Sequence, residues 1–324
     1  MAYPSMTLIF TNGRHKKRLI TREHDTKDRR RVLVYLNAEA QVLEAKLVPI
    51  AVEFIAQNPR TPPADIDTAR RVLRYVSETY LKQEPDMTDY NYANFDAGHY
   101  ELDTFPGPQP GQKAPDFMLE TLSGDKQNLL DFDGDFLVLE LASITCPLFQ
   151  SRRRAMKALQ KSNTKTSFSI LYVREAHPGA SRPCHKDSAD KRNNALALRD
   201  VDHEGRKILL DDMQGTAHAA YGSFPNSVFI INRNGCVVYT SDWNNPFATT
   251  RALAALKGGK AAAGQGIFLP APPPVAIKTL RDAGAGAAPD FLRSLPALIW
   301  KNLIKRNLRL VFHRPNPVLP DTRC

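Results

Sequence analysis

FLVLELASITCPLFQSRRRAMKALQK, residues 136–161, decides the fold of this chain. Its first part, 136–143, is a short apolar run of the kind found in buried strands. Proline follows Cys146 directly and is favoured in the first helical position, so we expect a helix from Pro147 to Lys161 with Cys146 as its N-cap. A second apolar run, FSILYV at 168–173, comes next. Together they predict a βαβ unit with two parallel strands.

The chain beyond this unit continues to alternate. Further strands are expected at 207–210, 227–231 and 236–239, and further helices at 188–199, 215–221 and 249–256. The last two strands are joined by NRNG, residues 232–235, which is a hairpin signal. A parallel unit followed by a terminal hairpin and a closing helix is the thioredoxin-like arrangement. We therefore predict an α/β domain over residues 113–256, with a mixed sheet of four or five strands flanked by helices.

The regions on either side of this domain differ from it in composition. Apolar spacing in residues 1–105 predicts a helical N-terminal region with helices at 38–56 and 65–81, joined to the domain by a proline-rich linker at 106–112. Residues 257–290 contain GGKAAAGQG, APPP and AGAGAA, and we expect a flexible linker there.

Residues 291–314 predict a basic amphipathic helix. Docking on the main domain or a partner is the ordinary expectation for it. Peripheral contact with a membrane surface is the alternative, because basic residues with Trp300 and Phe312 suit an interface.

Composition limits the class of protein. The chain has 324 residues, of which 42% are hydrophobic and 24% charged, and this profile excludes collagen-like, disordered and disulfide-scaffold classes. The basic cluster near the N-terminus follows a short apolar run instead of preceding it, so we expect no signal peptide and a cytoplasmic location. The net charge of +10 is dispersed and not interleaved with aromatic residues. We therefore expect no specific binding of nucleic acid.

The four cysteines are irregularly spaced. They form no CxxC pair, which argues against both a disulfide framework and a metal site. Cys236 lies in an expected strand and should pack there, and the terminal Cys324 carries no signal. In the motif CPLF, residues 146–149, Phe149 stands where a dithiol oxidoreductase has its second cysteine. A resolving thiol would have to lie elsewhere, and Cys184 is one candidate.

Cys146 is the candidate nucleophile. An N-cap thiol faces unpaired backbone N–H groups and the positive end of the helix dipole, which can lower its pKa from ~8.5 to ~3.5–7.5. Glu175 and His177 follow the second strand and should reach the same edge of the sheet. A histidine there can exchange protons near pH 7, and the carboxylate can orient it. His185 could reach the same crevice.

Five ordered blocks between Ala114 and Tyr239 resemble the iodothyronine deiodinase family of the thioredoxin-like superfamily. They are ASITCPLF (142–149), YVREAH (172–177), His185 followed by DKR (190–192), LLDDM (209–213) and AYG (220–222). The family's counterparts are GSCT-selenocysteine-PPF, YIEEAH, a histidine before a helix with DR, VLDTM and AYG. Cys146 occupies the selenocysteine position.

The resemblance implies a reaction. In the family, the nucleophilic chalcogen takes iodine from an iodophenyl ring, the ring carbon is protonated and an external thiol reduces the enzyme. Transferred to this chain, Cys146 is the nucleophile and His177 with Glu175 is the proton-relay or phenol-binding pair. His185 is expected to be a substrate-binding or relay histidine, and Thr145 and Ser143 are further expected substrate-binding residues. No bound cofactor is implied, and a homodimer is an open alternative for the oligomeric state.

The chain departs from the family at several points. Cysteine is a poorer nucleophile than selenocysteine, so we expect slower turnover. Ile144 replaces a cysteine that the family often uses. The N-terminal membrane anchor usual in the family has no counterpart in the sequence.

Two other functions stay open. Residues 114–132 also resemble the opening of peroxiredoxin and redoxin domains, and a peroxidase would act on a hydroperoxide. Ser143 and Cys146 match the second half of the peroxiredoxin loop, but Leu139 stands where its proline should be. The other alternative is a thioredoxin-fold binding module without turnover, which would not need a lowered pKa at Cys146.

Overall fold

A computed structural model describes residues 90–100, 102, 105–200, 202–262, 264–312 and 316–324, together with four short N-terminal strands. These strands are β1 (Thr11–Asn12), β2 (His15–Lys16), β3 (Ile20–His24) and β4 (Val32–Leu36). They form two antiparallel pairs, which the expectation of a helical region did not include. The helices expected at 38–56 and 65–81 lie outside the described residues. The chain divides into two units, residues 1–84 and 85–324.

The second unit is built on a seven-stranded mixed sheet with the order β11-β10-β7-β8-β9-β5-β6. Its strands are β5 (Met118–Thr121), β6 (Lys126–Asn128), β7 (Phe136–Ala142), β8 (Thr166–Tyr172), β9 (Lys207–Leu210), β10 (Val228–Asn232) and β11 (Val237–Ser241). The central strands β7, β8 and β9 are parallel, and the other pairs are antiparallel. The expected four or five strands are therefore too few. The sequence analysis missed β5 and the edge strand β6 because both are short and neither shows a clear apolar pattern.

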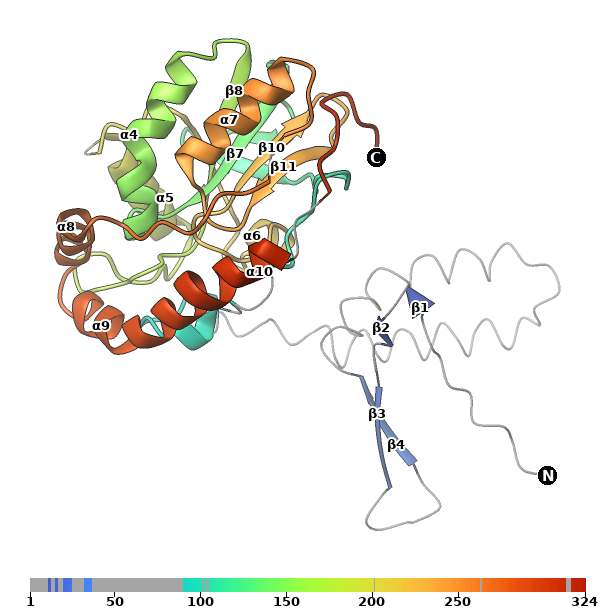
Figure 1. The fold of residues 1–324 in the computed structure, drawn as a ribbon. Helices are drawn as coiled ribbons and strands as arrows, with labels where there is room; N and C mark the ends of the chain where they lie inside the picture. The colour runs from blue at the N-terminus through green and yellow to red at the C-terminus, as the bar shows by residue number, and fades with distance from the viewer. Residues whose placement is uncertain are drawn as a thin grey trace, which may run out of the picture. The chain divides into compact units, whose positions relative to one another are not determined.

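Helices flank this sheet as expected (Figure 1). They are α4 (Pro147–Lys161), α5 (Ser188–Asp200), α6 (Thr216–Ala220) and α7 (Pro246–Lys257), and a 3-10 turn, η1 (Ala97–His99), precedes the sheet. Alternate residues of the central strands face opposite sides. Val138 and Ile230 pack with residues of α4 and α7, whereas Leu139 and Phe229 pack with Tyr221 and the segment before β7. This alternation places α4 and α7 on one face of the sheet and Tyr221 with the segment before β7 on the other.

The C-terminal region is helical over most of its length. It contains α8 (Pro273–Ala283), α9 (Ala287–Leu298), the π-helical η2 (Ile299–Arg306) and α10 (Asn307–Phe312). Within the linker expected over 257–290, residues 273–283 and 287–290 are helical, whereas residues 261–262 and 264–272 have no helix or strand. The prolines of APPP start α8, and Gly284 and Gly286 turn the chain into α9 with φ of +99° and +96°. The predicted amphipathic helix is present but starts at Ala287. In Figure 1, α8 lies beside α4.

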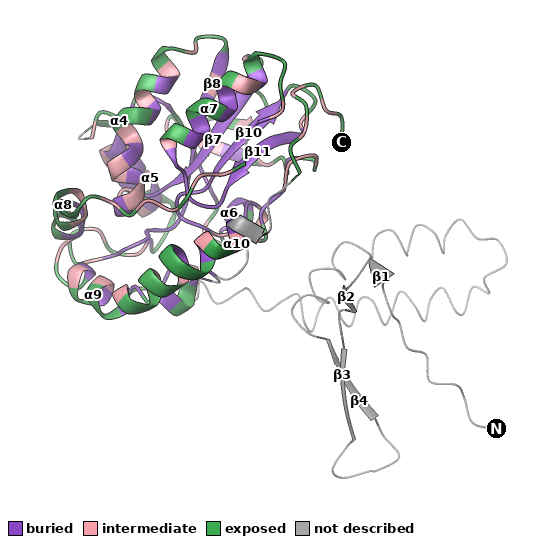
Figure 2. Ribbon diagram, viewed as in Figure 1, coloured by how far each residue is buried: buried purple, intermediate pink, exposed green. Residues whose placement is uncertain are grey.

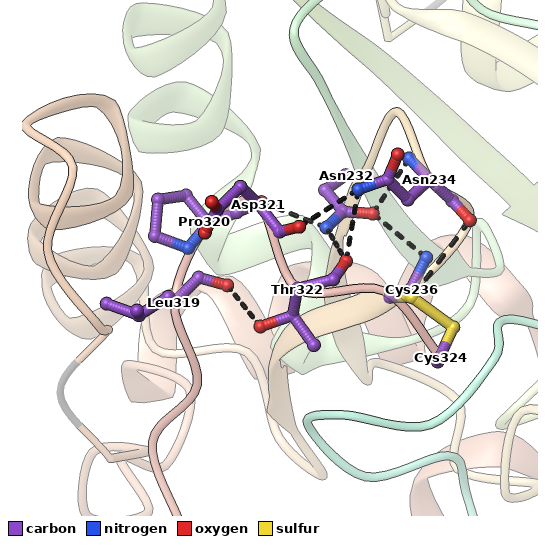
Figure 3. Close-up of a disulfide and its surroundings, with 8 residues drawn as sticks. All are labelled: Asn232, Asn234, Cys236, Leu319, Pro320, Asp321, Thr322 and Cys324. Atoms are coloured by element: carbon purple, nitrogen blue, oxygen red, sulfur yellow. Dashed lines mark hydrogen bonds between the residues drawn. A yellow bond between two sulfur atoms is a disulfide. The ribbon is translucent and has the colours of Figure 1, made fainter.

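The end of the chain is tied to the β10–β11 hairpin by a disulfide between Cys236 and Cys324 (Figure 3). Cys236 is buried as expected, but it is also bonded to Cys324, 88 positions further along the chain, so the tail returns to the hairpin. Asn232 Nδ2 donates to the carbonyls of Pro320 and Thr322 at 2.9 and 2.8 Å. The tail is thus held by polar contacts as well as by the covalent bond.

Among the described residues, no helix has both the length and the apolar character needed to cross a bilayer.

Candidate active site

Cys146 lies where the sequence predicts, at the N-cap of α4. Its backbone is extended, with φ −87° and ψ 111°, and Pro147 takes the first helical position. The side chain is only 2% exposed. Burial raises the pKa of the thiol to about 11, and this outweighs the opposing effects of the Phe149 and Leu148 backbone N–H groups and the Arg152 charge. The expected lowering of this pKa is therefore wrong, because burial disfavours the thiolate more than the helix terminus favours it.

The thiol nevertheless lines a cavity of about 920 Å³. Cys146 and His177 share this cavity wall. Most of the remaining wall is apolar, with aromatic side chains from the segments before and after the sheet: Phe95, Tyr100, Trp243, Phe268 and Phe291. Helices α8 and α9 supply much of the rest. The cavity can therefore enclose an apolar, ring-containing ligand next to the sulfur.

His177 is held between two aromatic rings on this wall. Its ring centroid lies 4.1 Å from that of Phe95 and 5.3 Å from that of Phe291. Within the described part of the chain, its buried Nδ1 has no hydrogen-bond partner. Burial lowers the pKa of the imidazole to about 3, so the ring is neutral at pH 7. A neutral, unpartnered ring nitrogen can accept a hydrogen bond or a proton from a ligand.

Glu175 points away from this arrangement into a buried hydrogen-bond network. Its carboxylate accepts from the backbone N–H and hydroxyl of Thr145 at 3.1 and 2.6 Å, from Asn194 Nδ2 at 3.1 Å and from the Tyr172 hydroxyl. His185 Nε2 lies 3.0 Å from Oε1. Burial alone would raise the pKa of Glu175, but the hydrogen bonds and His185 lower it below its ordinary value.

The expectation that Glu175 orients the His177 ring is therefore wrong. None of these five hydrogen-bonding groups belongs to His177. Through Thr145, Glu175 connects the loop that carries His177 to the loop that carries Cys146. His185 is likewise packed against Glu175 and, in the described residues, is not part of the cavity wall. Its expected role in substrate binding stays a prediction.

Ser143 and Thr145 hold the same loop. Ser143 Oγ accepts from the Ala176 backbone N–H at 3.1 Å, and Thr145 Oγ1 accepts from that of His177 at 3.1 Å. As far as the structure describes the chain, neither residue lines the cavity. Both residues position the loop, and their expected substrate contact stays a prediction. Cys184 is a free, half-buried thiol outside the described cavity wall, and its resolving role stays a prediction.

Arg174 and three tyrosines are site-supporting residues that the sequence analysis missed. The guanidinium carbon lies 5.0, 4.8 and 4.7 Å from the ring centroids of Tyr90, Tyr92 and Tyr100. Tyr92 also donates to the Ala176 carbonyl at 2.8 Å. These contacts fasten the segment that carries Phe95 to the loop that carries His177. The aromatic residues that cluster in DYNYANFDAGHY, residues 89–100, could have indicated from the sequence that this segment supports the site.

Comparison with known proteins assigns the sequence to a family. Residues 77–249, more than half of the chain, match the model of the iodothyronine deiodinase family. This chain belongs to the iodothyronine deiodinase family. The matched range contains Cys146, Glu175, His177 and His185, so the thioredoxin-like domain predicted from the sequence is the family's domain.

Individual relatives are more distant. Over 152 residues, this family member is 30% identical to thyroxine 5-deiodinase of Aquarana catesbeiana, covering 43% of this chain and 56% of that protein. It is 29% identical to thyroxine 5-deiodinase of Homo sapiens, covering 49% of that protein. The chain thus spans about half the length of the curated relatives it matches.

Among solved structures, it is similar to a hypothetical protein of Sinorhizobium meliloti 1021, with 19% identity and a TM-score of 0.39 over 48% of this chain and 88% of that one. It is also similar to a secreted Mycobacterium tuberculosis disulfide oxidoreductase, with 15% identity and a TM-score of 0.35 over 43% of this chain and 96% of that one.

Proposed function

We propose that this protein is a thiol-dependent oxidoreductase that removes iodine reductively from an iodinated phenol, with Cys146 as the nucleophile. One observation carries the proposal. In a chain of the deiodinase family, the Cys146 sulfur and the neutral His177 ring lie on the wall of one largely apolar cavity. The cavity suits an uncharged aromatic ring, and the two side chains suit the iodine and the phenol oxygen.

The proposed reaction begins at the Cys146 sulfur. The thiolate attacks the iodine atom, the sulfur–iodine bond forms, and the electron pair of the carbon–iodine bond stays on the ring carbon. That carbon takes up a proton, which balances the proton lost by the thiol. An external thiol then displaces iodide and forms a mixed disulfide with Cys146. A second external thiol releases its disulfide and restores the Cys146 thiol, so two thiols are oxidised for each iodide released.

His177 is the proposed proton carrier and phenol-binding group. Because burial keeps its imidazole neutral, it can accept a hydrogen bond from the phenol hydroxyl. The Cys146 proton leaves to solvent, because a thiol with a pKa of about 11 does not protonate an imidazole with a pKa of about 3. An imidazolium formed during the reaction would be strongly acidic and would give its proton to the ring carbon readily. Phe95 and Phe291 restrict the orientation of the imidazole while this happens.

The raised pKa of Cys146 limits the rate. A thiol with a pKa of about 11 is ionised in about one molecule in 10⁴ at pH 7. Turnover should therefore be slow at neutral pH and rise with pH. Cysteine in place of selenocysteine should also lower the rate of turnover, because it is the poorer nucleophile.

A paired assay tests this function. The full chain is incubated with an iodophenol and dithiothreitol, and iodide release is compared with consumption of hydrogen peroxide under the same conditions. We expect iodide release that requires both dithiothreitol and Cys146, with little peroxide turnover. Rapid peroxide consumption without iodide release would favour the peroxiredoxin-like alternative.

A non-catalytic binding module is the second candidate, and the raised pKa of Cys146 is the observation that favours it. Such a module would hold an apolar ring in the cavity without reacting with it. An iodophenol that binds stoichiometrically, releases no iodide between pH 7 and 10 and leaves the Cys146 thiol free would identify this function.

A further inference from the structure

The C-terminal helical segment, residues 287–312, packs on the protein through polar side chains. Its buried positions include Asp290, Ser294, Asn302 and Arg306, which lie at multiples of four residues on one side of the helix. Ser294 Oγ accepts from the Ala97 backbone N–H at 3.2 Å, and Asn302 Oδ1 accepts from Trp243 Nε1 at 2.9 Å. Arg306 forms a buried ion pair with Asp242. A helix that packed only through its apolar stripe would not bury this set.

Several large apolar side chains of the C-terminal helices are exposed. We define the outer apolar face as seven residues of α8, α9, η2 and α10 that are 36–66% exposed: Ile277, Leu292, Ile299, Trp300, Leu303, Ile304 and Leu308. Figure 2 shows exposed positions along the outer side of this helical segment. So many large apolar side chains in succession mark a surface that binds a partner.

Charge identifies the kind of partner. Residues 287–312 contain five lysine or arginine residues and one acid, Asp290. Three of the five pair with acids: Arg309 and the buried Arg306 pair with Asp242, and Arg293 pairs with Asp290. Lys301 and Lys305 alternate with Trp300, Leu303 and Ile304 along η2. A second copy of this basic face would repel the first. An anionic bilayer instead offers phosphates to the basic groups and acyl chains to the aliphatic ones, and tryptophan favours the boundary between them.

The outer apolar face also borders the opening of the cavity. Ile277, Leu292, Ile299 and Leu303 belong both to this face and to the cavity wall that holds Cys146. These half-exposed side chains therefore connect the solvent side of the helices with the interior of the cavity. An apolar ligand dissolved in lipid would meet the cavity at this edge.

We infer that the outer apolar face docks on the surface of a bilayer containing anionic phospholipids, with the mouth of the Cys146 cavity turned toward the lipid. The helices lie in the plane of the surface and do not cross it. The docking itself does not depend on the proposed reaction. It would deliver apolar ligands to the cavity whether Cys146 reacts with them or only binds beside them.

Vesicle binding by the full chain tests this inference. The chain is sedimented with phosphatidylcholine vesicles with and without phosphatidylglycerol, and tryptophan emission is recorded. The sequence has two tryptophans, and Trp243 is buried whereas Trp300 is 58% exposed, so a blue shift on binding would come from Trp300. We expect binding that needs phosphatidylglycerol, weakens with salt and gives this shift.

Matched variants separate this face from the rest of the surface. Ile304→Glu with Leu308→Glu, and separately Lys301→Gln with Lys305→Gln, should each lower vesicle partitioning about tenfold or more. Met118→Glu changes another exposed apolar residue, on β5 and outside this face, and should leave partitioning unchanged. Circular dichroism checks that each variant is folded.

Three results would overturn the inference: no sedimentation with anionic vesicles, equal binding to vesicles without phosphatidylglycerol, or folded Ile304→Glu with Leu308→Glu protein that binds as well as the parent. A dimer that dissociates in the same variant, without any vesicle binding by the parent, would assign the face to a second copy of the chain.

Discussion

Glu175 Oε1 and His185 Nε2 lie 3.0 Å apart, and both side chains are completely buried. This pair lies behind the wall of the cavity, while His177, two residues along the chain from Glu175, lies on it. The same carboxylate accepts from the backbone of Thr145, next to Cys146. Glu175 therefore joins the two loops that carry the nucleophile and the candidate proton carrier.

Replacing Glu175 should destabilise the fold. Glu175→Gln keeps the size of the side chain but exchanges one acceptor oxygen for a donor among groups that already donate. We expect a loss of about 3 kcal/mol in the free energy of unfolding, measured by urea denaturation. Asp200→Asn, at a fully exposed ion pair with Arg199, is the control and should leave the midpoint unchanged. Equal midpoints for the two variants would show that Glu175 does not hold the loops.

The pH dependence of Cys146 alkylation should follow its burial. Because burial disfavours the thiolate, the folded protein keeps the proton up to a pKa of about 11. The rate of reaction with iodoacetamide should therefore rise about tenfold per pH unit from pH 7 to 10. Mass spectrometry distinguishes Cys146 from the half-buried Cys184, which serves as the reference thiol. A plateau in the Cys146 rate below pH 8 would contradict the assigned effect of burial.

His177 should matter for turnover more than for the reactivity of Cys146. His177→Phe keeps an aromatic ring between Phe95 and Phe291 but removes the nitrogen that can carry a proton. We expect iodide release to fall about 10²–10⁴-fold in this variant and in His177→Ala, with nearly unchanged alkylation of Cys146. Glu175→Gln should cost less turnover, provided it is measured where the variant is folded. Parent-like iodide release by His177→Phe would remove His177 from the reaction.

The disulfide between Cys236 and Cys324 should stabilise the second unit of the chain. It closes a loop that includes α7, α8, α9, η2 and α10, with a sequence separation of 88 residues. The chain-entropy model gives a loss of roughly 4–5 kcal/mol when such a loop is opened, and a real loss somewhat below that is expected. Cys324→Ser can be compared with Cys184→Ser by urea denaturation without reductant. Equal stability of the two variants would mean that the disulfide contributes nothing measurable.

The sequence predicted the central part of the fold because local and long-range signals agree there. The apolar runs at 136–143 and 168–173 form β7 and β8, and Pro147 starts α4 where its chemistry requires. β5 and β6 were missed because Met118 and Lys126 are exposed and carry no apolar pattern. The residues of α8 resemble a linker in composition. Their packing beside α4, which the sequence does not reveal, makes α8 part of the cavity wall.

The candidate site was predicted less completely than the fold. Cys146 and His177 were placed on one cavity by the rule that parallel strands end at the same edge of the sheet. That rule says nothing of side-chain direction, so it could not show that Glu175 turns toward His185. It also could not show that Cys146 is buried in a core cluster with Phe149 and Ala176, or that helices from residues 273–312 line the cavity beside it. Those effects arise from contacts between segments far apart in the sequence.

Iodide release from an iodophenol in the presence of dithiothreitol, compared between the parent chain and Cys146→Ser at pH 8 to 10, tests the central claim most directly. The proposed function predicts release by the parent that increases with pH, and none above background by Cys146→Ser, whose hydroxyl lacks an accessible pKa. Equal release by both proteins, or release by neither while the iodophenol binds in the cavity, would contradict the proposed function.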